Sequence, residues 1–153
     1  MLGNHQQARL NYDLALTNIP QSSNLLKADV YNDRGLARFE LLDLKAAMLD
    51  FSEAIRLNPN DYRAYYNRGC ACGRSGDRSC AVRDFSDSLK RNPINAQAYL
   101  NRGIAYHQLD HEPAAIADLQ KAVEYFAQQR ETQTSDTSIY YSGLFRRRCI
   151  NAG

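Results

Sequence analysis

Residues 62–95, YRAYYNRGCACGRSGDRSCAVRDFSDSLKRNPIN, repeat the pattern of residues 28–61, ADVYNDRGLARFELLDLKAAMLDFSEAIRLNPND. The two segments are identical at eleven positions, where about two would be expected from ordinary composition. Residues 96–129 form a third copy at the same interval of 34 residues, which is marked by Gly35, Gly69 and Gly103. A period of this length is typical of stacked-repeat proteins, whose units bury their apolar faces against their neighbours.

Each repeat contains two apolar runs of helical spacing, separated by a short breaker. In residues 62–95 the breaker contains Gly76, which suits a helix end, and Asp77, which suits the cap of the next helix. Pro59 and Pro93 follow the second runs, and proline disfavours helix in the residue before it. The pattern predicts an all-α chain of helix–turn–helix units, with helices at 27–41, 44–57, 62–74, 78–91, 96–109 and 113–129.

The two ends of the chain depart from the repeat. Residues 3–20 read as the second helix of a partial repeat, with Ala8 and Tyr12 in the slots of Ala47 and Phe51. The first helix of that unit is absent from the sequence, so the helix is expected to belong to a fragment, to cap the stack, or to pair with another molecule. The repeat array therefore spans residues 1–129. Residues 130–153 are predicted to be a polar linker followed by a capping helix, or by a tail that docks on another chain or stays disordered.

Composition excludes several classes of function. Nineteen Lys and Arg residues oppose seventeen Asp and Glu residues, and this balance gives no reason to expect nucleic-acid or membrane binding. The polar segment after Met1 is neither a secretory signal nor a membrane span. The four cysteines show no paired framework, which favours a reduced, cytoplasmic setting.

The units resemble the tetratricopeptide repeat (TPR), whose pattern is W-x2-L-G-x2-Y…A-x3-F…P over 34 residues. The glycine slot holds Gly35, Gly69 and Gly103, the alanine slot Ala47, Ala81 and Ala115, the phenylalanine slot Phe51, Phe85 and Leu119, the tryptophan slot Tyr31, Tyr65 and Tyr99, and the proline slot Pro59 and Pro93. The resemblance covers about residues 3–129 and implies an α-α superhelix of stacked repeats.

The leucine slot departs from this pattern because it holds an arginine in every copy. An arginine in a nominal core position should have a carboxylate partner. An aspartate recurs sixteen residues later in each unit, which gives the candidate pairs Arg34 with Asp50, Arg68 with Asp84, and Arg102 with Asp118. We expect structural ion pairs, either within each unit or between an aspartate and the arginine of the next unit.

In TPR arrays the first helices line a concave groove, and the resemblance implies the same surface here. Helical spacing places on it Asn32, Asp33, Leu36, Phe39, Glu40, Arg63, Tyr66, Asn67, Cys70, Arg74, Gln97, Leu100, Asn101, Ile104 and His107. Asn67 and Asn101 occupy equivalent slots. Resemblance to the asparagine ladder of some TPR peptide binders implies that these two grip a peptide backbone. The alternative is that they hydrogen-bond locally on their own helix.

Other kinds of site are not expected. The slots that form a carboxylate clamp in some TPR domains hold Asn32, Leu36, Asn67, Gln97 and Asn101, and they lack the cations that a clamp needs. Cys70 and Cys72 point some 200° apart on a helix, so with Cys80 they read as small apolar fillers rather than metal ligands. None of His5, His107 and His111 stands in a motif with a nucleophile. The sequence therefore predicts no catalytic residue, metal or cofactor.

The function predicted from the sequence is a non-enzymatic protein–protein interaction scaffold that binds an extended or helical segment of a partner protein in its groove. The main alternative is a homodimer formed through the helix at residues 3–20. A helical-repeat RNA-binding module ranks lower, because the groove mixes acidic Asp33 and Glu40 with basic Arg63 and Arg74. An accessory module of a multidomain enzyme is the remaining alternative.

Overall fold

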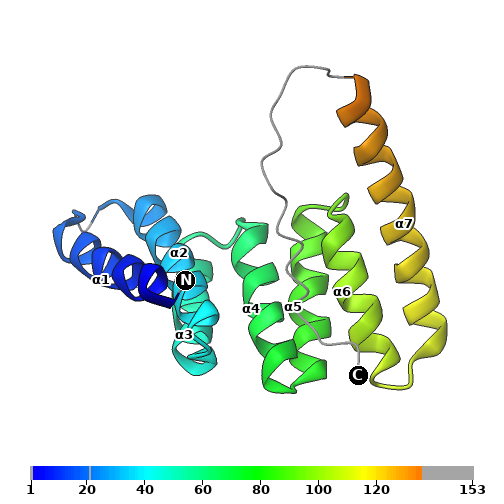
Figure 1. The fold of residues 1–153 in the computed structure, drawn as a ribbon, viewed down its shortest axis with the longest axis horizontal. Coiled ribbons are helices and arrows are strands. Elements are labelled where there is room, and N and C mark those ends of the chain that lie inside the picture. Colours follow the sequence, from blue (N-terminus) through cyan, green and yellow to red (C-terminus); the bar gives the residue numbers. More distant parts are fainter. Residues whose placement is uncertain (1, 21, 136–153) are drawn as a thin grey trace.

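The computed structural model describes the backbone of residues 2–20 and 22–135, with the side chains of residues 4–20 and 22–130. Over this part the chain forms seven helices and no strand. They are α1 (Leu2–Asn18), α2 (Asn24–Glu40), α3 (Leu44–Leu57), α4 (Tyr62–Ser75), α5 (Arg78–Arg91), α6 (Ala96–His107) and α7 (Glu112–Ser135). Consecutive helices pack against each other along the chain (Figure 1). The predicted all-α repeat fold is confirmed.

Close packing within each unit depends on its glycine. A Cβ atom at Gly35 would lie 2.6 Å from Cε1 of Phe51, and one at Gly69 would lie 2.9 Å from Cδ1 of Phe85. Both phenylalanine rings are fully buried. The absence of a side chain at these positions therefore allows α2 to approach α3, and α4 to approach α5, closely enough to bury an aromatic ring between them.

The turn inside each unit uses the same backbone conformation at the same slot. Gly76 ends α4 with φ of 94°, and the equivalent Leu42 and Asp110 have φ of 64° and 58°. The next helix then begins after a side-chain cap, since Asp43 accepts a hydrogen bond from Ala46 N and Asp77 one from Cys80 N. The turn geometry is thus set by the repeat, even where the residue with positive φ is not glycine.

Helix boundaries differ from expectation mainly at the C-terminal side. α6 ends at His107 and α7 continues to Ser135, so the expected end near residue 129 is wrong by about two turns. Residues 128–135 contain no Gly or Pro and include Gln, Arg and Glu, which favour helix. α7 therefore continues well beyond α6 (Figure 1). The expected capping helix or tail falls on residues 136–153, outside the described part of the chain.

No helix among the described residues is both long and apolar enough to cross a membrane.

Candidate partner-binding groove

Hydrogen bonds between side chains join the three first helices across the face predicted to be the groove. Asn67 Nδ2 of α4 donates to Asn32 Oδ1 of α2 at 2.8 Å. Asn101 Nδ2 of α6 donates to the Tyr66 hydroxyl of α4 at 3.0 Å. Both bonds connect different helices, so neither asparagine bonds only within its own helix. These bonds fix the spacing of the three helices on this face.

The predicted groove residues differ widely in exposure. The exposed ones are Asp33, Arg63, Arg74 and His107. The half-buried ones are Leu36, Glu40, Tyr66, Asn67, Gln97, Leu100 and Ile104. The buried ones are Asn32, Phe39, Cys70 and Asn101. A ligand on this face would therefore meet the first two groups, while the buried group supports them from below.

Asn101 is the most deeply covered of these polar side chains. It is 0% exposed, and its Oδ1 atom is buried without a hydrogen-bond partner among the described residues. An unsatisfied buried acceptor costs about 1–3 kcal/mol. Asn67, in the equivalent slot, is only half-buried. The two asparagines therefore differ in how directly a ligand could reach them.

The exposed basic residues of the groove are already engaged. Arg63 Nη2 lies 2.7 Å from Asp29 Oδ1 and 2.8 Å from Asp61 Oδ2. Hydrogen bonds to Asp61, and then to Asp29, raise the pKa of Arg63. The guanidinium of Arg74 lies over the Phe39 ring, 5.1 Å from its centroid. The face predicted to be the groove is thus mixed in charge rather than a continuous basic stripe.

A pocket of about 270 Å³ lies at the N-terminal end of this face, between α1 and α2. Its lining consists of His5, Ala8, Tyr12, Asp33, Leu36, Ala37 and Glu40. Partial desolvation in the pocket raises the pKa of Asp33, although its side chain remains largely exposed, and desolvation together with the Asp33 charge raises the pKa of Tyr12. The lining therefore combines three aliphatic side chains with two carboxylates, a histidine and a tyrosine. Sequence reasoning named His5 without a role and did not place Ala8 or Tyr12 in a site.

The recurring arginines pair with the aspartates of their own units. Arg34 donates to both oxygens of Asp50, from Nε at 3.0 Å and from Nη2 at 2.6 Å. Arg102 donates in the same way to Asp118, at 2.6 and 2.8 Å. The aspartates are almost fully buried. Of the two arrangements considered from sequence, the structure has the pairing within each unit.

The remaining nitrogen of each arginine reaches the preceding helix pair. Arg68 Nη1 donates to Ser52 Oγ at 3.0 Å, and Arg102 Nη1 donates to Ser86 Oγ at 2.9 Å. In the first unit the equivalent contact is an ion pair, because Asp13 of α1 occupies the serine slot and lies 2.7 Å from Arg34 Nη1. The arginine in the leucine slot therefore links neighbouring units as well as the two helices of its own unit.

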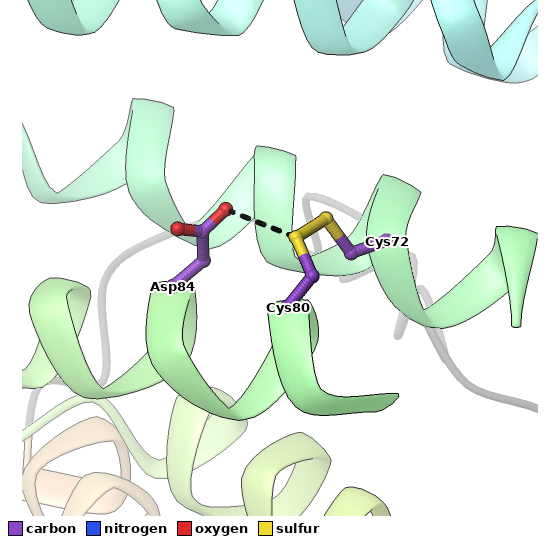
Figure 2. Close-up of side chains that lie close together, drawn as sticks. All are labelled: Cys72, Cys80 and Asp84. Atoms are coloured by element: carbon purple, nitrogen blue, oxygen red, sulfur yellow. Dashed lines mark hydrogen bonds between the residues drawn. A yellow bond between two sulfur atoms is a disulfide. The ribbon is translucent and has the colours of Figure 1, made fainter. Parts of the chain in front are cut away.

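Cys72 and Cys80 form a disulfide that joins α4 to α5, as Figure 2 shows. The expectation of unpaired cysteines is therefore wrong for these two residues. Cys72 lies near the end of α4 and Cys80 near the start of α5, so the short turn brings their Cα atoms to 5.7 Å. The separation of eight positions across a predicted tight turn is the signal in the sequence that could have indicated this contact.

Asp84 lies beside the disulfide, with Oδ2 4.0 Å from Cys80 Sγ (Figure 2). The two sulfur atoms and this carboxylate are close enough together to suggest metal ligands. In this state, however, the sulfurs are bonded to each other, and the carboxylate accepts hydrogen bonds from Arg68 at 2.7 and 2.9 Å. The two sulfur atoms and the carboxylate are therefore already bonded to other groups. Together with Arg68 they join α4 to α5 in the middle unit.

Comparison with known proteins identifies the repeat. Family models described as tetratricopeptide repeat match residues 28–61 and 73–131. No curated protein matches the chain.

Solved structures of TPR proteins have the same fold. MamA superposes with a TM-score of 0.66 at 26% identity, over 69% of this chain and 61% of MamA. The TPR domain of Arabidopsis OM64 superposes with a TM-score of 0.68 at 26% identity, over 74% of this chain and 93% of the OM64 chain. YrrB is described as a TPR protein with an unusual peptide-binding site. It superposes with a TM-score of 0.70 at 21% identity, over 87% of this chain and 66% of the YrrB chain. The chain spans between 61% and 71% of the length of the MamA chains that it matches.

The family models and the repeated helix pairs lead to one assignment. The chain belongs to the tetratricopeptide repeat family.

Proposed function

We propose that this protein binds an extended or helical segment of a partner protein on the face formed by α2, α4 and α6. Membership of the TPR family supports the broader role of a protein–protein interaction scaffold, and this fold generally serves as a non-enzymatic one. Our proposal adds to this role the face that binds the partner, formed by α2, α4 and α6, and the residues on it that contact the bound segment.

The observation that supports the proposal most directly is a set of half-buried side chains on helices that hydrogen bonds join to one another. Tyr66, Asn67 and Leu100 are partly exposed on adjacent helices, and two of them take part in the hydrogen bonds between those helices. Side chains that are already held in place lose little conformational entropy on binding. The mixture of an aromatic ring, an amide and an apolar side chain suits a peptide, which offers both backbone and side-chain groups.

Asn101 has a supporting role in this proposal. Its Nδ2 atom donates to the Tyr66 hydroxyl, and its buried Oδ1 atom has no hydrogen-bond partner within the described part of the chain. A ligand N–H group that reached this oxygen on displacement of Tyr66 would satisfy it. Asn67 is the better placed of the two asparagines for direct contact, because it is only half-buried. YrrB, with its unusual peptide-binding site, has the same fold, which makes a peptide the first ligand class to test.

The test begins with a random-peptide display library selected against the intact chain. The affinity of a selected peptide is then measured by calorimetry for the unmodified chain and for Tyr66→Ala, Asn67→Ala and Leu100→Ala. We expect each groove variant to weaken binding by about tenfold, which corresponds to about 1.4 kcal/mol. Leu49→Ala, on an exposed position of α3, is the control and should bind normally. Equal affinity of all four variants would reject the groove.

Self-association is a second candidate because α1 exposes two leucines one turn apart. Leu10 is 51% exposed and Leu14 is 65% exposed. Exposed apolar side chains that adjoin one another can form part of an interaction surface. Sedimentation velocity over a concentration series should show a dimer that Leu10→Ser and Leu14→Ser together convert to a monomer. A monomer at every concentration would remove this candidate.

A further inference from the structure

Three sulfur-containing side chains meet where the unit of residues 28–61 packs against the unit of residues 62–95. Met48, the one methionine of the sequence besides Met1, lies on α3. Its Sδ atom is 3.8 Å from Sγ of Cys72 on α4. Cys72 is bonded to Cys80 on α5, and Met48 and Cys80 both pack against the buried core cluster that contains Cys72. Three neighbouring helices thus each contribute one sulfur atom to the same place.

The repeat fold does not require this group of side chains. One repeat later the three equivalent slots hold residues without sulfur, namely Val82, Tyr106 and Ala114. The helices α5 and α6 pack against each other at that later junction, as α3 and α4 do at this one. The three sulfur atoms are therefore a feature of this junction and not of the array.

The spacing of the sulfur atoms suits ligands of one metal ion. With a metal–sulfur bond of about 2.3 Å, two sulfur ligands lie about 3.8 Å apart in a tetrahedral arrangement and about 4.0 Å apart in a trigonal one. The separation of Met48 Sδ from Cys72 Sγ, 3.8 Å, already has this value. A disulfide offers no thiolate to a metal, so Cys72 and Cys80 become ligands only after their bond is reduced.

The kind of donor atom selects a soft ion. Thiolate and thioether sulfurs favour Cu(I), whereas Zn(II) sites are built from cysteine, histidine and carboxylate ligands. A carboxylate does lie nearby, since Asp84 Oδ2 is 4.0 Å from Cys80 Sγ (Figure 2). Both oxygens of Asp84, however, accept hydrogen bonds from Arg68. The buried Asp84 would have to leave this pair in order to bind an ion, which leaves the three sulfur atoms as the ligand set.

We propose that, once the disulfide is reduced, Met48, Cys72 and Cys80 bind one Cu(I) ion through sulfur alone. Two molecules of a small thiol supply the two electrons and two protons that convert the disulfide to two thiols, and they leave joined as their own disulfide. Each protein thiol releases its proton when it binds the ion. The site then consists of Cu(I), two thiolates and one thioether. This inference goes beyond the groove function and does not rest on it.

The ion would connect more of the array than the disulfide does. The disulfide joins α4 to α5 within one unit, whereas an ion held by Met48 as well would also join α3 of the preceding unit. Cys72 is only 2% exposed, but Met48 and Cys80 are half-buried. Copper could therefore reach the site from the surface on the side of these two residues.

Competition for Cu(I) with the coloured chelator bicinchoninate tests the proposal. The full chain carries Cys70→Ala and Cys149→Ser, so that Cys72 and Cys80 are its two remaining cysteines. One sample is reduced with dithiothreitol and desalted under nitrogen, and the other keeps its disulfide. We expect the reduced chain to withdraw one equivalent of Cu(I) from the chelator, and the oxidised chain to withdraw none. Circular dichroism checks that both samples are folded.

Substitution of the methionine separates this site from a simple pair of thiols. Met48→Leu keeps the size and apolar character of the side chain and removes the thioether. Its reduced form should bind Cu(I) at least about tenfold more weakly, because even the partners that only orient metal ligands contribute that much. Leu49→Ala, on the adjacent exposed position of α3, is the matched control and should leave the Cu(I) affinity unchanged. The double variant Cys72→Ala and Cys80→Ala should withdraw no copper.

X-ray absorption at the copper edge identifies the ligands directly. We expect three sulfur neighbours in the loaded chain and two in its Met48→Leu variant. Oxygen or nitrogen neighbours in the loaded chain would overturn the proposal. So would failure of the reduced chain to withdraw copper, an unchanged affinity in Met48→Leu, or copper bound in the absence of Cys72 and Cys80.

Discussion

Arg68 and Asp84 are joined by two parallel hydrogen bonds, from Nε to Oδ2 at 2.7 Å and from Nη2 to Oδ1 at 2.9 Å. Asp84 is 1% exposed, whereas a quarter of the Arg68 side chain is accessible. A bidentate pair with one buried partner is costly to break, because the remaining charge keeps its desolvation penalty. The same geometry recurs in the first and third units, which makes the pair a property of the repeat.

Asp84→Ala should therefore destabilise the protein strongly. We expect a loss of about 3 kcal/mol in the free energy of unfolding, measured by urea denaturation. Asp87→Ala is the matched control on the same helix, where Asp87 pairs with a mostly exposed Lys90 at 2.8 Å. That control should cost less than about 1 kcal/mol. Equal effects of the two substitutions would show that burial of the pair does not matter.

Leu42 provides a second test, because it adopts a positive φ in the slot that holds Gly76 in the next unit. A non-glycine residue in this conformation costs about 1–2 kcal/mol, and the Leu42 side chain is 62% exposed. Leu42→Gly should thus raise the free energy of unfolding by up to about 1 kcal/mol, after the greater freedom of glycine in the unfolded chain is subtracted. The reverse kind of substitution at the equivalent slot, Gly76→Ala, should lower the free energy of unfolding. A Leu42→Gly variant less stable than the parent chain would contradict this explanation of the turn.

The disulfide between Cys72 and Cys80 closes a short loop, since the two cysteines lie eight positions apart in the sequence. A loop of this size corresponds to about 2.5 kcal/mol of stabilisation in the chain-entropy description. The double variant Cys72→Ala and Cys80→Ala should lose about that amount in urea denaturation, with helicity retained. Mass spectrometry after alkylation without reductant should leave both cysteines unlabelled in the parent chain. Full labelling of either cysteine would show that the bond does not form.

The raised pKa of Asp33 predicts a pH-dependent effect with a definite sign. The folded state binds the Asp33 proton more tightly than the unfolded state, so this group's contribution to stability falls as pH rises through the window between the two pKa values. Asp33→Asn should raise the free energy of unfolding at pH 7. This gain should vanish at about pH 3, which lies below the ordinary pKa of an aspartate carboxyl group. Thermal unfolding at both pH values measures the difference. A gain that is larger at pH 3 than at pH 7 would contradict the assignment.

The repeat made most of the fold predictable from the sequence. The period that aligns Gly35, Gly69 and Gly103 fixes the helix pairs, and the break at Gly76 and Asp77 fixes the turn between α4 and α5. The end of α7 was harder to place, because the polar residues after Gln128 lack an apolar period yet include good helix formers. A helix can continue without a buried face when nothing in its sequence stops it.

The site was less predictable, for reasons of geometry. Helical spacing placed Asn67 and Asn101 on one face, but Asn101 is fully buried and Asn67 is only half-buried, a difference that the spacing does not contain. The contact between Cys72 and Cys80 depends on the angle at which two helices meet across a turn. Alignment of the repeats alone could not provide that angle, nor the pocket that Tyr12 and Asp33 share.

The most direct test of the central claim, that the face of α2, α4 and α6 binds a partner segment, is site-specific photocrosslinking. A photoreactive amino acid placed at Leu100, on the groove, is compared with one at Leu49, on the exposed side of α3, in the presence of the peptide selected from the display library. The account predicts a crosslinked product from Leu100 and none from Leu49. Crosslinking at Leu49 equal to or greater than that at Leu100 would contradict it.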